Sequence, residues 1–183
     1  MSNIILITHQ KGGVGKSTLT FNLAQNLSKE SKVAILDFDL QGSLSQLSEL
    51  ITDFDIFPFS ENIEDIVEMD YDFIFIDTPP YLSNHLPQLI KLADLIIVPT
   101  KAGILDLLAI KSTLELIEKV NGSDRCMIVF NMVKANTTLT LDILISLEEY
   151  NVPIAKTHIG DLVAFTRSVL IKGCRVIKMR KNN

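Results

Sequence analysis

The chain has 183 residues, of which 47% are apolar and 21% are charged, and its formal net charge is −5. This composition predicts one folded domain over residues 1–183. It excludes a disordered chain and a protein whose whole surface binds nucleic acid.

No run of about 18 apolar residues occurs, so no transmembrane helix is predicted. The first apolar run follows no basic segment and indicates a strand rather than a signal peptide. Cys126 and Cys174 stand alone, which predicts neither a disulfide nor a zinc site and makes a reducing cytoplasm the default.

Short apolar runs alternate with longer segments of helical period. Strands are predicted at residues 4–8, 32–37, 73–77, 95–99, 127–131 and 152–156. Helices are predicted at residues 17–28, 43–50, 63–68, 85–92, 105–120, 139–150 and 161–171. The runs IILI, FIFI and LIIV are apolar at consecutive positions, which is typical of strands covered on both faces. The alternation predicts right-handed β-α-β units in a doubly wound α/β domain, with a mostly parallel sheet and helices on both faces.

Residues 51–70 have the least regular pattern. Their apolar side chains fit either a short extra strand or core-filling loop residues, and we favour the second interpretation; they are Phe54, Ile56, Phe57 and Phe59.

A glycine-rich turn, HQKGGVGKST at residues 9–18, joins the first predicted strand to the first predicted helix. In such a turn successive backbone N–H groups face one concavity, and the helix N-terminus adds partial positive charge. The turn is therefore predicted to bind the phosphates of ATP, with Lys16 against the β- and γ-phosphates and Ser17 on Mg²⁺. The template G-x-x-x-x-G-K-S/T fails at one position, where Gln10 replaces glycine. The predicted ATP-binding residues of the turn are Gly12, Gly13, Val14, Gly15, Lys16, Ser17 and Thr18.

The stretch KGGVGKST resembles the deviant Walker A motif of the ParA/MinD family of P-loop ATPases. Lys11, before two glycines, matches the signature lysine of that family, and Gln10 is similar to the ParA branch. The resemblance implies a P-loop NTPase fold and a homodimer with ATP at the interface, where Lys11 contacts the nucleotide of the other subunit. The chain is most similar to small ParA proteins of the ParF type, because it is short between its two acidic motifs.

Two acidic motifs follow apolar strands, at the sheet edge where open α/β folds bind ligands. Asp77 ends the run FIFI in a Walker B arrangement and is predicted to bind Mg²⁺. Residues 37–42, DFDLQG, resemble the family's switch I, with Leu40 where proline is usual. The resemblance implies that Asp39 orients the hydrolytic water and that Asp37 helps to hold the phosphate loop. A helix cap or a turn is the alternative for a single aspartate. The resulting assignments are Lys11, Lys16 and Asp39 as catalytic residues, Ser17, Asp39 and Asp77 as metal ligands, and Asp37, Asp39 and Gln41 as switch I.

Two further segments have open interpretations. Asn131 ends a predicted strand and is expected to bind the adenine edge together with Pro153, although asparagine also stabilises local turns. Residues 98–107 place Asp106 and Leu107 at the start of a long helix. By resemblance this segment contacts the second subunit, and an ordinary strand-loop-helix connection is the equal alternative.

The C-terminal end is basic. Residues 167–183 contain six basic residues and no acidic one; they are Arg167, Lys172, Arg175, Lys178, Arg180 and Lys181. Clusters of this kind bind DNA phosphates without sequence preference. A solvated terminus is the second interpretation. A membrane-binding helix is the last, because few large apolar residues follow Gly173. Family members often carry arginine where Asp161 stands, which leaves the DNA-contacting residues open.

The resemblance as a whole implies an ATP- and Mg²⁺-dependent dimerising ATPase that partitions plasmid or chromosomal DNA. It would be associated with the nucleoid in the cytoplasm and stimulated by a centromere-binding or adaptor protein. The alternatives are a MinD-like ATPase on the membrane, a P-loop enzyme acting on a small molecule, and a regulator that binds ATP without hydrolysing it.

Overall fold

A six-stranded parallel sheet forms the centre of the protein, with strand order β3-β2-β4-β1-β5-β6. The computed structural model describes residues 2–58, 62–81, 83–134 and 141–161. The strands are β1 (Asn3–Ile7), β2 (Val33–Asp37), β3 (Asp55–Pro58), β4 (Phe73–Asp77), β5 (Leu95–Thr100) and β6 (Cys126–Phe130). The central strands are almost completely buried, as their unbroken apolar runs predict.

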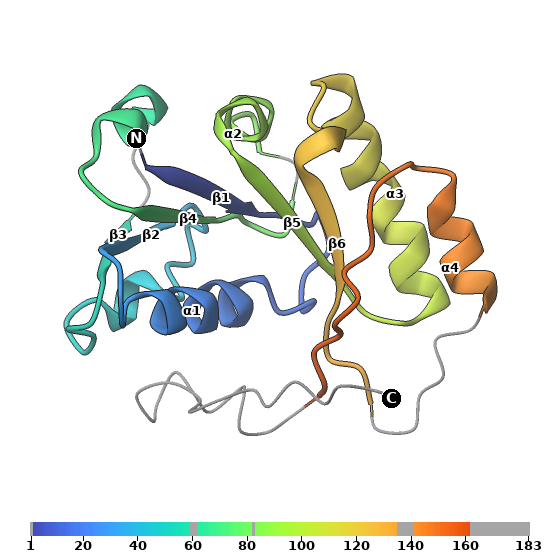
Figure 1. Ribbon diagram of the computed structural model, residues 1–183, viewed down its shortest axis with the longest axis horizontal. Helices are drawn as coiled ribbons and strands as arrows, with labels where there is room; N and C mark the ends of the chain where they lie inside the picture. The colour runs from blue at the N-terminus through green and yellow to red at the C-terminus, as the bar shows by residue number, and fades with distance from the viewer. Residues whose placement is uncertain (1, 59–61, 82, 135–140, 162–183) are drawn as a thin grey trace.

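Helices lie on both faces of the sheet, as Figure 1 shows. The α-helices are α1 (Lys16–Leu27), α2 (Leu86–Leu92), α3 (Ile104–Lys119) and α4 (Leu141–Glu148), and the 3₁₀ helices are η1 (Ser45–Leu47), η2 (Ile63–Glu68) and η3 (Ser123–Arg125). One apolar cluster packs α1 against one face through side chains such as Phe21 and Ala24. The other cluster packs η2, α2 and α3 against the opposite face through Ile66, Leu89 and Ile110. The predicted doubly wound α/β architecture is confirmed.

The register of the central strands brings their carboxyl ends together. Asp77 at the end of β4 is paired in register with Ile7 of β1 and with Asp37 of β2. The glycine-rich turn therefore leaves β1 beside the two acidic strand ends, at one edge of the sheet.

Three of the predicted elements are wrong. The segment favoured as loop contains β3, a short edge strand in which Ile56 is the buried side chain. The helix expected at residues 43–50 is only the 3₁₀ turn η1, in which the N–H of Leu47 bonds to the carbonyl of Leu44 and that of Ser48 to Ser45, three residues back. The strand expected at residues 152–156 is a single bridge between Ile128 and Ile154. Apart from Asp161, the helix predicted at residues 161–171 lies outside the described residues.

Candidate nucleotide site

The turn between β1 and α1 is shaped by two glycines in left-handed backbone conformations. Gly13 has φ 72° and Gly15 has φ 88°, values that residues with a side chain rarely adopt. Gly15 is also the N-cap of α1, so the loop delivers its N–H groups to the positive end of that helix. A Cβ atom on Gly15 would lie 2.4 Å from Nδ2 of Asn131. These left-handed glycines at the start of α1 are compatible with the predicted phosphate-binding turn.

Lys16 begins α1 and is buried beneath the loop. Its Nζ donates to the carbonyl of Lys11 at 3.4 Å, which places the ammonium group inside the turn. Burial lowers the pKa of Lys16, whereas the nearby charges of Asp77 and Asp39 raise it. A buried cation held against the backbone of the loop suits a phosphate bound within the same subunit.

Asp77 lies fully buried below the loop, next to α1. Its Oδ1 accepts a hydrogen bond from Oγ1 of Thr20 at 3.4 Å, and the Ser17 hydroxyl also donates to this carboxylate. Its Oδ2 is buried and has no hydrogen-bond partner among the residues that the structure describes. An orphaned carboxylate oxygen beside a serine hydroxyl is a donor set that Mg²⁺ accepts. The predicted metal ligands Ser17 and Asp77 therefore fit the ion.

The surroundings of Asp77 make its charge costly. Burial raises its pKa to about 7. The Ser17 hydrogen bond and the Lys16 charge oppose this shift, whereas the carboxylates of residues 37 and 39 add to it. A divalent cation would offset the concentrated negative charge of these groups.

Asp37 is hydrogen-bonded to the segment that follows it, and its expected role in holding the phosphate loop stays a prediction. Its Oδ1 accepts from the N–H of Asp39 at 3.1 Å. Its Oδ2 accepts from the N–H groups of Leu44 and Ser45 and from the Ser45 hydroxyl, at 2.9–3.0 Å. In the described part of the chain these bonds hold residues 39–45, not the phosphate loop. Asp37 thus fixes the segment that carries Asp39 and Gln41.

Asp39 follows Asp37 on this fixed segment and is close to the loop. Its Oδ1 accepts from the N–H of Gln41 at 3.0 Å. Its charge acts on both Lys16 and Asp77. This position beside the predicted γ-phosphate end is compatible with the predicted roles in catalysis and metal binding.

Lys11 points away from the loop interior. Its Nζ is 2.5 Å from Oδ1 of Asp106, in the first turn of α3. Its backbone N–H donates to Nδ1 of His9 at 2.9 Å. His9 is fully buried, and burial lowers its pKa to about 4, so it is the neutral acceptor that this bond requires. The sequence predicted no role for His9, although its position directly before the loop indicates that it could contact the loop backbone.

Asn131 is committed to the phosphate loop. Its Nδ2 donates to the carbonyl of Val14 at 2.8 Å, and its Oδ1 accepts from the N–H of Met132 at 3.0 Å. The amide thus stabilises a local turn, as one alternative expected, and it also bonds to the phosphate loop, which neither alternative included. The carbonyl of Pro153 accepts from the N–H of Ile128 on β6. Contact of Asn131 or Pro153 with adenine stays a prediction.

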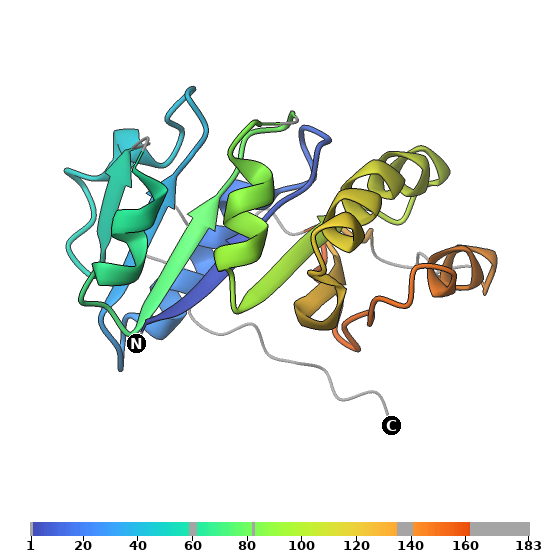
Figure 2. The same cartoon turned by 90° about the horizontal axis from the view of Figure 1, so that it is seen from above.

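Large apolar side chains are exposed on segments that come after the carboxyl ends of three strands. They follow β2, β4 and β5, and they are Leu40, Tyr81, Ile104, Leu105 and Leu108, with 49–74% of their surfaces exposed. Figure 2 shows the loop after β1 beside the loop after β4. A Cβ on Gly12 would lie 3.6 Å from Cβ of Pro80, which confirms the close approach of the two loops. We call these five side chains the apolar rim.

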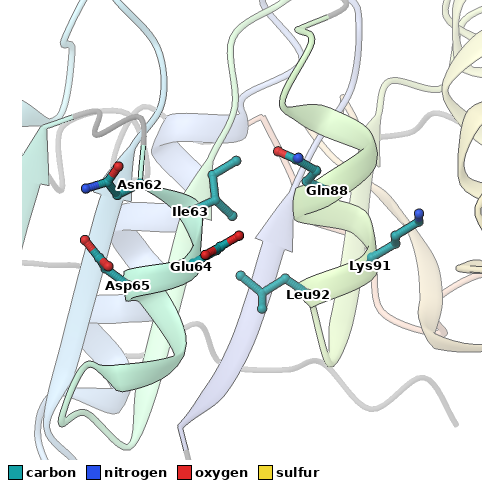
Figure 3. A pocket seen from close by; sticks show the side chains of 7 residues that line it. All are labelled: Asn62, Ile63, Glu64, Asp65, Gln88, Lys91 and Leu92. Carbon is teal, nitrogen blue, oxygen red and sulfur yellow. The ribbon is translucent and has the colours of Figure 1, made fainter.

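A separate groove of about 760 Å³ lies between η2 and α2, as Figure 3 shows. Its lining residues are Asn62, Ile63, Glu64, Asp65, Gln88, Lys91 and Leu92. None of them belongs to the glycine-rich turn or to the strand ends around it. The volume of this groove is therefore no guide to the nucleotide site.

The six basic residues predicted to bind DNA, Arg167 to Lys181, lie outside the described residues. Among the helices that the structure describes, none has the length and apolar character needed to span a membrane.

Comparison with known proteins agrees with this geometry. The family profile described as "CobQ/CobB/MinD/ParA nucleotide binding domain" matches residues 5–171. The chain is 25% identical to "Maintenance of carboxysome distribution protein A" of Halothiobacillus neapolitanus, over 96% of this chain and 87% of that protein.

Solved structures with the same fold include proteins of different activity. A putative plasmid partition protein of Borrelia burgdorferi bound to AMPPNP has a TM-score of 0.73 and 21% identity, covering 97% of this chain and 93% of that one. The cobyrinic acid a,c-diamide synthase of Mycobacterium smegmatis, with bound ADP and magnesium, has a TM-score of 0.72 and 18% identity, covering 92% and 93%. At these identities the likeness shows the fold alone.

Proposed function

The chain belongs to the CobQ/CobB/MinD/ParA family of nucleotide-binding domains, and from this premise we propose that it is an ATP- and Mg²⁺-dependent ATPase whose ATP-bound form is a homodimer that positions a cargo on DNA. The observation that carries the proposal is the opposite orientation of the two lysines in one loop. Lys16 turns into the loop, and Lys11 turns out of it toward α3. Lys11 is thus placed to reach a group outside its own loop, whereas Lys16 is not.

Each part of the site has a task in this mechanism. The loop N–H groups and Lys16 hold the phosphates of ATP within the subunit. Ser17 and Asp77 hold Mg²⁺, which when bound neutralises charge on the phosphates. Asp39 orients the attacking water, on the segment that Asp37 fixes. Lys11 contacts the phosphates of the second subunit.

The apolar rim supports association between subunits at this edge. Leu40, Ile104 and Leu108 each expose about 70% of their surfaces, and Ile104 and Leu108 also line a groove between α3 and the end of α4. Exposed apolar groups gathered in one region mark interaction surfaces more often than isolated ones do. Because the nucleotide would be part of the interface, ATP would select the dimer and hydrolysis would remove that preference.

The cargo and partners are the finer part of the proposal. Similarity to proteins named for carboxysome distribution and for plasmid partition supports a positioning role. The six basic residues between Arg167 and Lys181 would bind DNA without sequence preference and place the protein on the nucleoid. A centromere-binding or adaptor protein would stimulate hydrolysis.

A small-molecule enzyme is the second candidate, and the likeness to the cobyrinic acid a,c-diamide synthase fold favours it. Such an enzyme needs a pocket for its substrate beside the γ-phosphate. The apolar rim suits a protein surface better than a polar metabolite, so we rank this candidate second.

Sizing the protein by sedimentation tests the proposal. We expect a monomer without nucleotide or with ADP, and a dimer with Mg²⁺ and a non-hydrolysable ATP analogue. The Lys11→Ala variant should bind the nucleotide and stay monomeric. A wild type that remains monomeric with the analogue would contradict the proposed function.

DNA binding is tested separately by fluorescence anisotropy with an unrelated duplex. The dimeric form should bind, with an affinity that falls steeply as salt rises. Replacing Lys178, Arg180 and Lys181 with glutamine should weaken binding without preventing dimerisation. If the dimer does not bind DNA, the proposed DNA binding is wrong, and the proposed ATPase activity is unaffected.

A further inference from the structure

Helix α3 is fastened to the start of the phosphate loop at two points. The backbone N–H of Gln10 donates to Oγ1 of Thr113 at 3.2 Å, and Nζ of Lys11 pairs with Asp106. Asp106 and Thr113 are seven residues apart, so they lie on the same side of the helix, two turns from each other. The same side of α3 buries Ile110 in the core. The start of the loop therefore lies along a fixed helix.

The backbone and the side chain of Lys11 are held by different groups. Its N–H is bound to the buried His9, and the preceding N–H is bound to Thr113. These bonds fix the loop but do not restrain the ammonium group, whose contact in the described residues is Asp106. The Lys11 side chain can thus change partner while the loop keeps its shape.

Asp106 is well placed to retain a cation. It stands in the first turn of α3, where the helix dipole favours a carboxylate. Its side chain is 13% exposed, compared with 35% for Lys11, so the pair is partly shielded from water. Gly103 leaves room for it, because a Cβ at that position would lie 2.8 Å from Oδ2 of Asp106.

We propose that Asp106 positions Lys11 within its own subunit before ATP is bound, as a latch that must open when Lys11 crosses to the second subunit. This inference rests on the proposed function. Asp106 and the phosphates of the partner's ATP compete for one ammonium group. The latch keeps the cation from the interface until a nucleotide offers more negative charge than one carboxylate, and so it raises the threshold for dimerisation.

The size of the effect follows from the geometry. A partly exposed ion pair shifts an equilibrium by about two- to fivefold. Two latches open for each dimer, and the apparent Kd rises as the inverse of the competent fraction of each subunit. The two factors multiply, so removal of both latches should lower the dimer Kd by about four- to 25-fold.

The test measures the dimer Kd by sedimentation, with Mg²⁺ and the non-hydrolysable ATP analogue. Asp106→Asn keeps the shape of the side chain and removes its charge, and we expect tighter dimerisation by the factor above. Asp70→Asn is the matched control, because it breaks the exposed Lys32–Asp70 pair on the same protein. This control should leave the dimer Kd unchanged.

A second variant opens the latch without removing charge. Gly103→Ala introduces a Cβ into the space that the Asp106 carboxylate occupies, at a residue whose φ of −120° accepts alanine. It should tighten dimerisation less than Asp106→Asn does. Affinity of the monomer for a fluorescent ATP analogue, together with the melting temperature, shows that each variant is folded.

A double variant shows whether Asp106→Asn acts through Lys11 or through a general change in α3. Adding Asp106→Asn to Lys11→Ala should leave dimerisation as poor as in Lys11→Ala alone. The latch is wrong if Asp106→Asn leaves the Kd unchanged or raises it, or if its gain persists without Lys11. If the wild type dimerises and any of these results is found, only the latch proposal is rejected and the proposed function stands. A wild type that never dimerises removes the proposed function and the latch together.

Discussion

Strands β2 and β4 are neighbours, and each ends in a buried aspartate at the same register position. The two carboxylates are used in opposite ways. Both oxygens of Asp37 accept hydrogen bonds from the protein, from residues 39, 44 and 45. Asp77 keeps one oxygen that has no hydrogen-bond partner within the described part of the chain. The chain has therefore completed one of these sites by itself and left the other to be completed by a ligand.

This difference teaches how to separate a structural carboxylate from a metal-binding one. Position and burial are the same for the two residues, so neither decides the role. The number of satisfied oxygens decides it, because a buried polar atom without a partner costs free energy unless something else binds it. For Asp37 the completing group is its own chain, and for Asp77 we infer that it is Mg²⁺.

The largest effect should come from Asp77→Asn. Asparagine keeps one oxygen but loses the negative charge and the second oxygen, so ATP turnover should fall by about 100- to 1,000-fold, the range for loss of one electrostatic group in a catalytic site. Release of phosphate, measured at saturating ATP and Mg²⁺, checks this. Turnover within a few-fold of the wild type would show that Asp77 does not serve the metal.

Asp37→Ala should act mainly on folding. It leaves the buried N–H of Leu44 and the part-buried N–H of Ser45 without an acceptor, which should destabilise the protein by about 3 kcal/mol. Urea unfolding measures the loss. The matched variant is Asp77→Ala, which removes a carboxylate with an unpaired oxygen and should cost much less. Equal losses of stability for the two variants would show that the two carboxylates do not differ in structural role.

The pH dependence of stability should distinguish the two aspartates as well. The pKa of Asp77 is raised from 3.8 to about 7 in the folded protein. Its contribution to stability is fully present below about 4 and is lost as pH rises toward about 7, because only the unfolded chain then releases the proton. Without Mg²⁺, Asp77→Asn should therefore gain stability relative to the wild type across this window. A constant difference between the two proteins would contradict the raised pKa.

The smallest effect separates the serines that serve the two carboxylates. Ser45→Ala removes one of the hydrogen bonds to Asp37 and should cost about 1 kcal/mol in urea unfolding, with little change in nucleotide binding. Ser17→Ala should do the reverse, weakening the binding of Mg²⁺ and ATP more than it weakens the fold. If Ser45→Ala weakened nucleotide binding and Ser17→Ala weakened only the fold, the metal would belong to Asp37 rather than to Asp77.

The sequence was sufficient for the parts of the fold that depend on burial and on local turn chemistry. Strands covered on both faces have continuous apolar runs, and a left-handed turn needs its glycines, so β1, β4, β5 and the loop with Gly13 and Gly15 were predictable. The strand β3 was not. It lies at the edge of the sheet, buries mainly Ile56 and ends in a proline, so its pattern differs little from that of a loop.

Contacts distant in sequence were beyond prediction for a different reason. Lys11 and Asp106 are 95 residues apart, and nothing in their neighbourhoods encodes the pairing. The role of Asn131 likewise depends on the loop that faces it, 117 residues earlier. In each case the tertiary fold supplies the partner.

The central claim is that two subunits share each ATP, and mixing two inactive variants tests it most directly. Lys16→Ala cannot hold its own phosphates but still offers Lys11, whereas Lys11→Ala binds ATP but offers no lysine to its partner. We predict that each variant alone has little turnover and that their mixture recovers it, because the mixed dimer contains a complete site. A mixture as inactive as its components would show that Lys11 serves its own subunit.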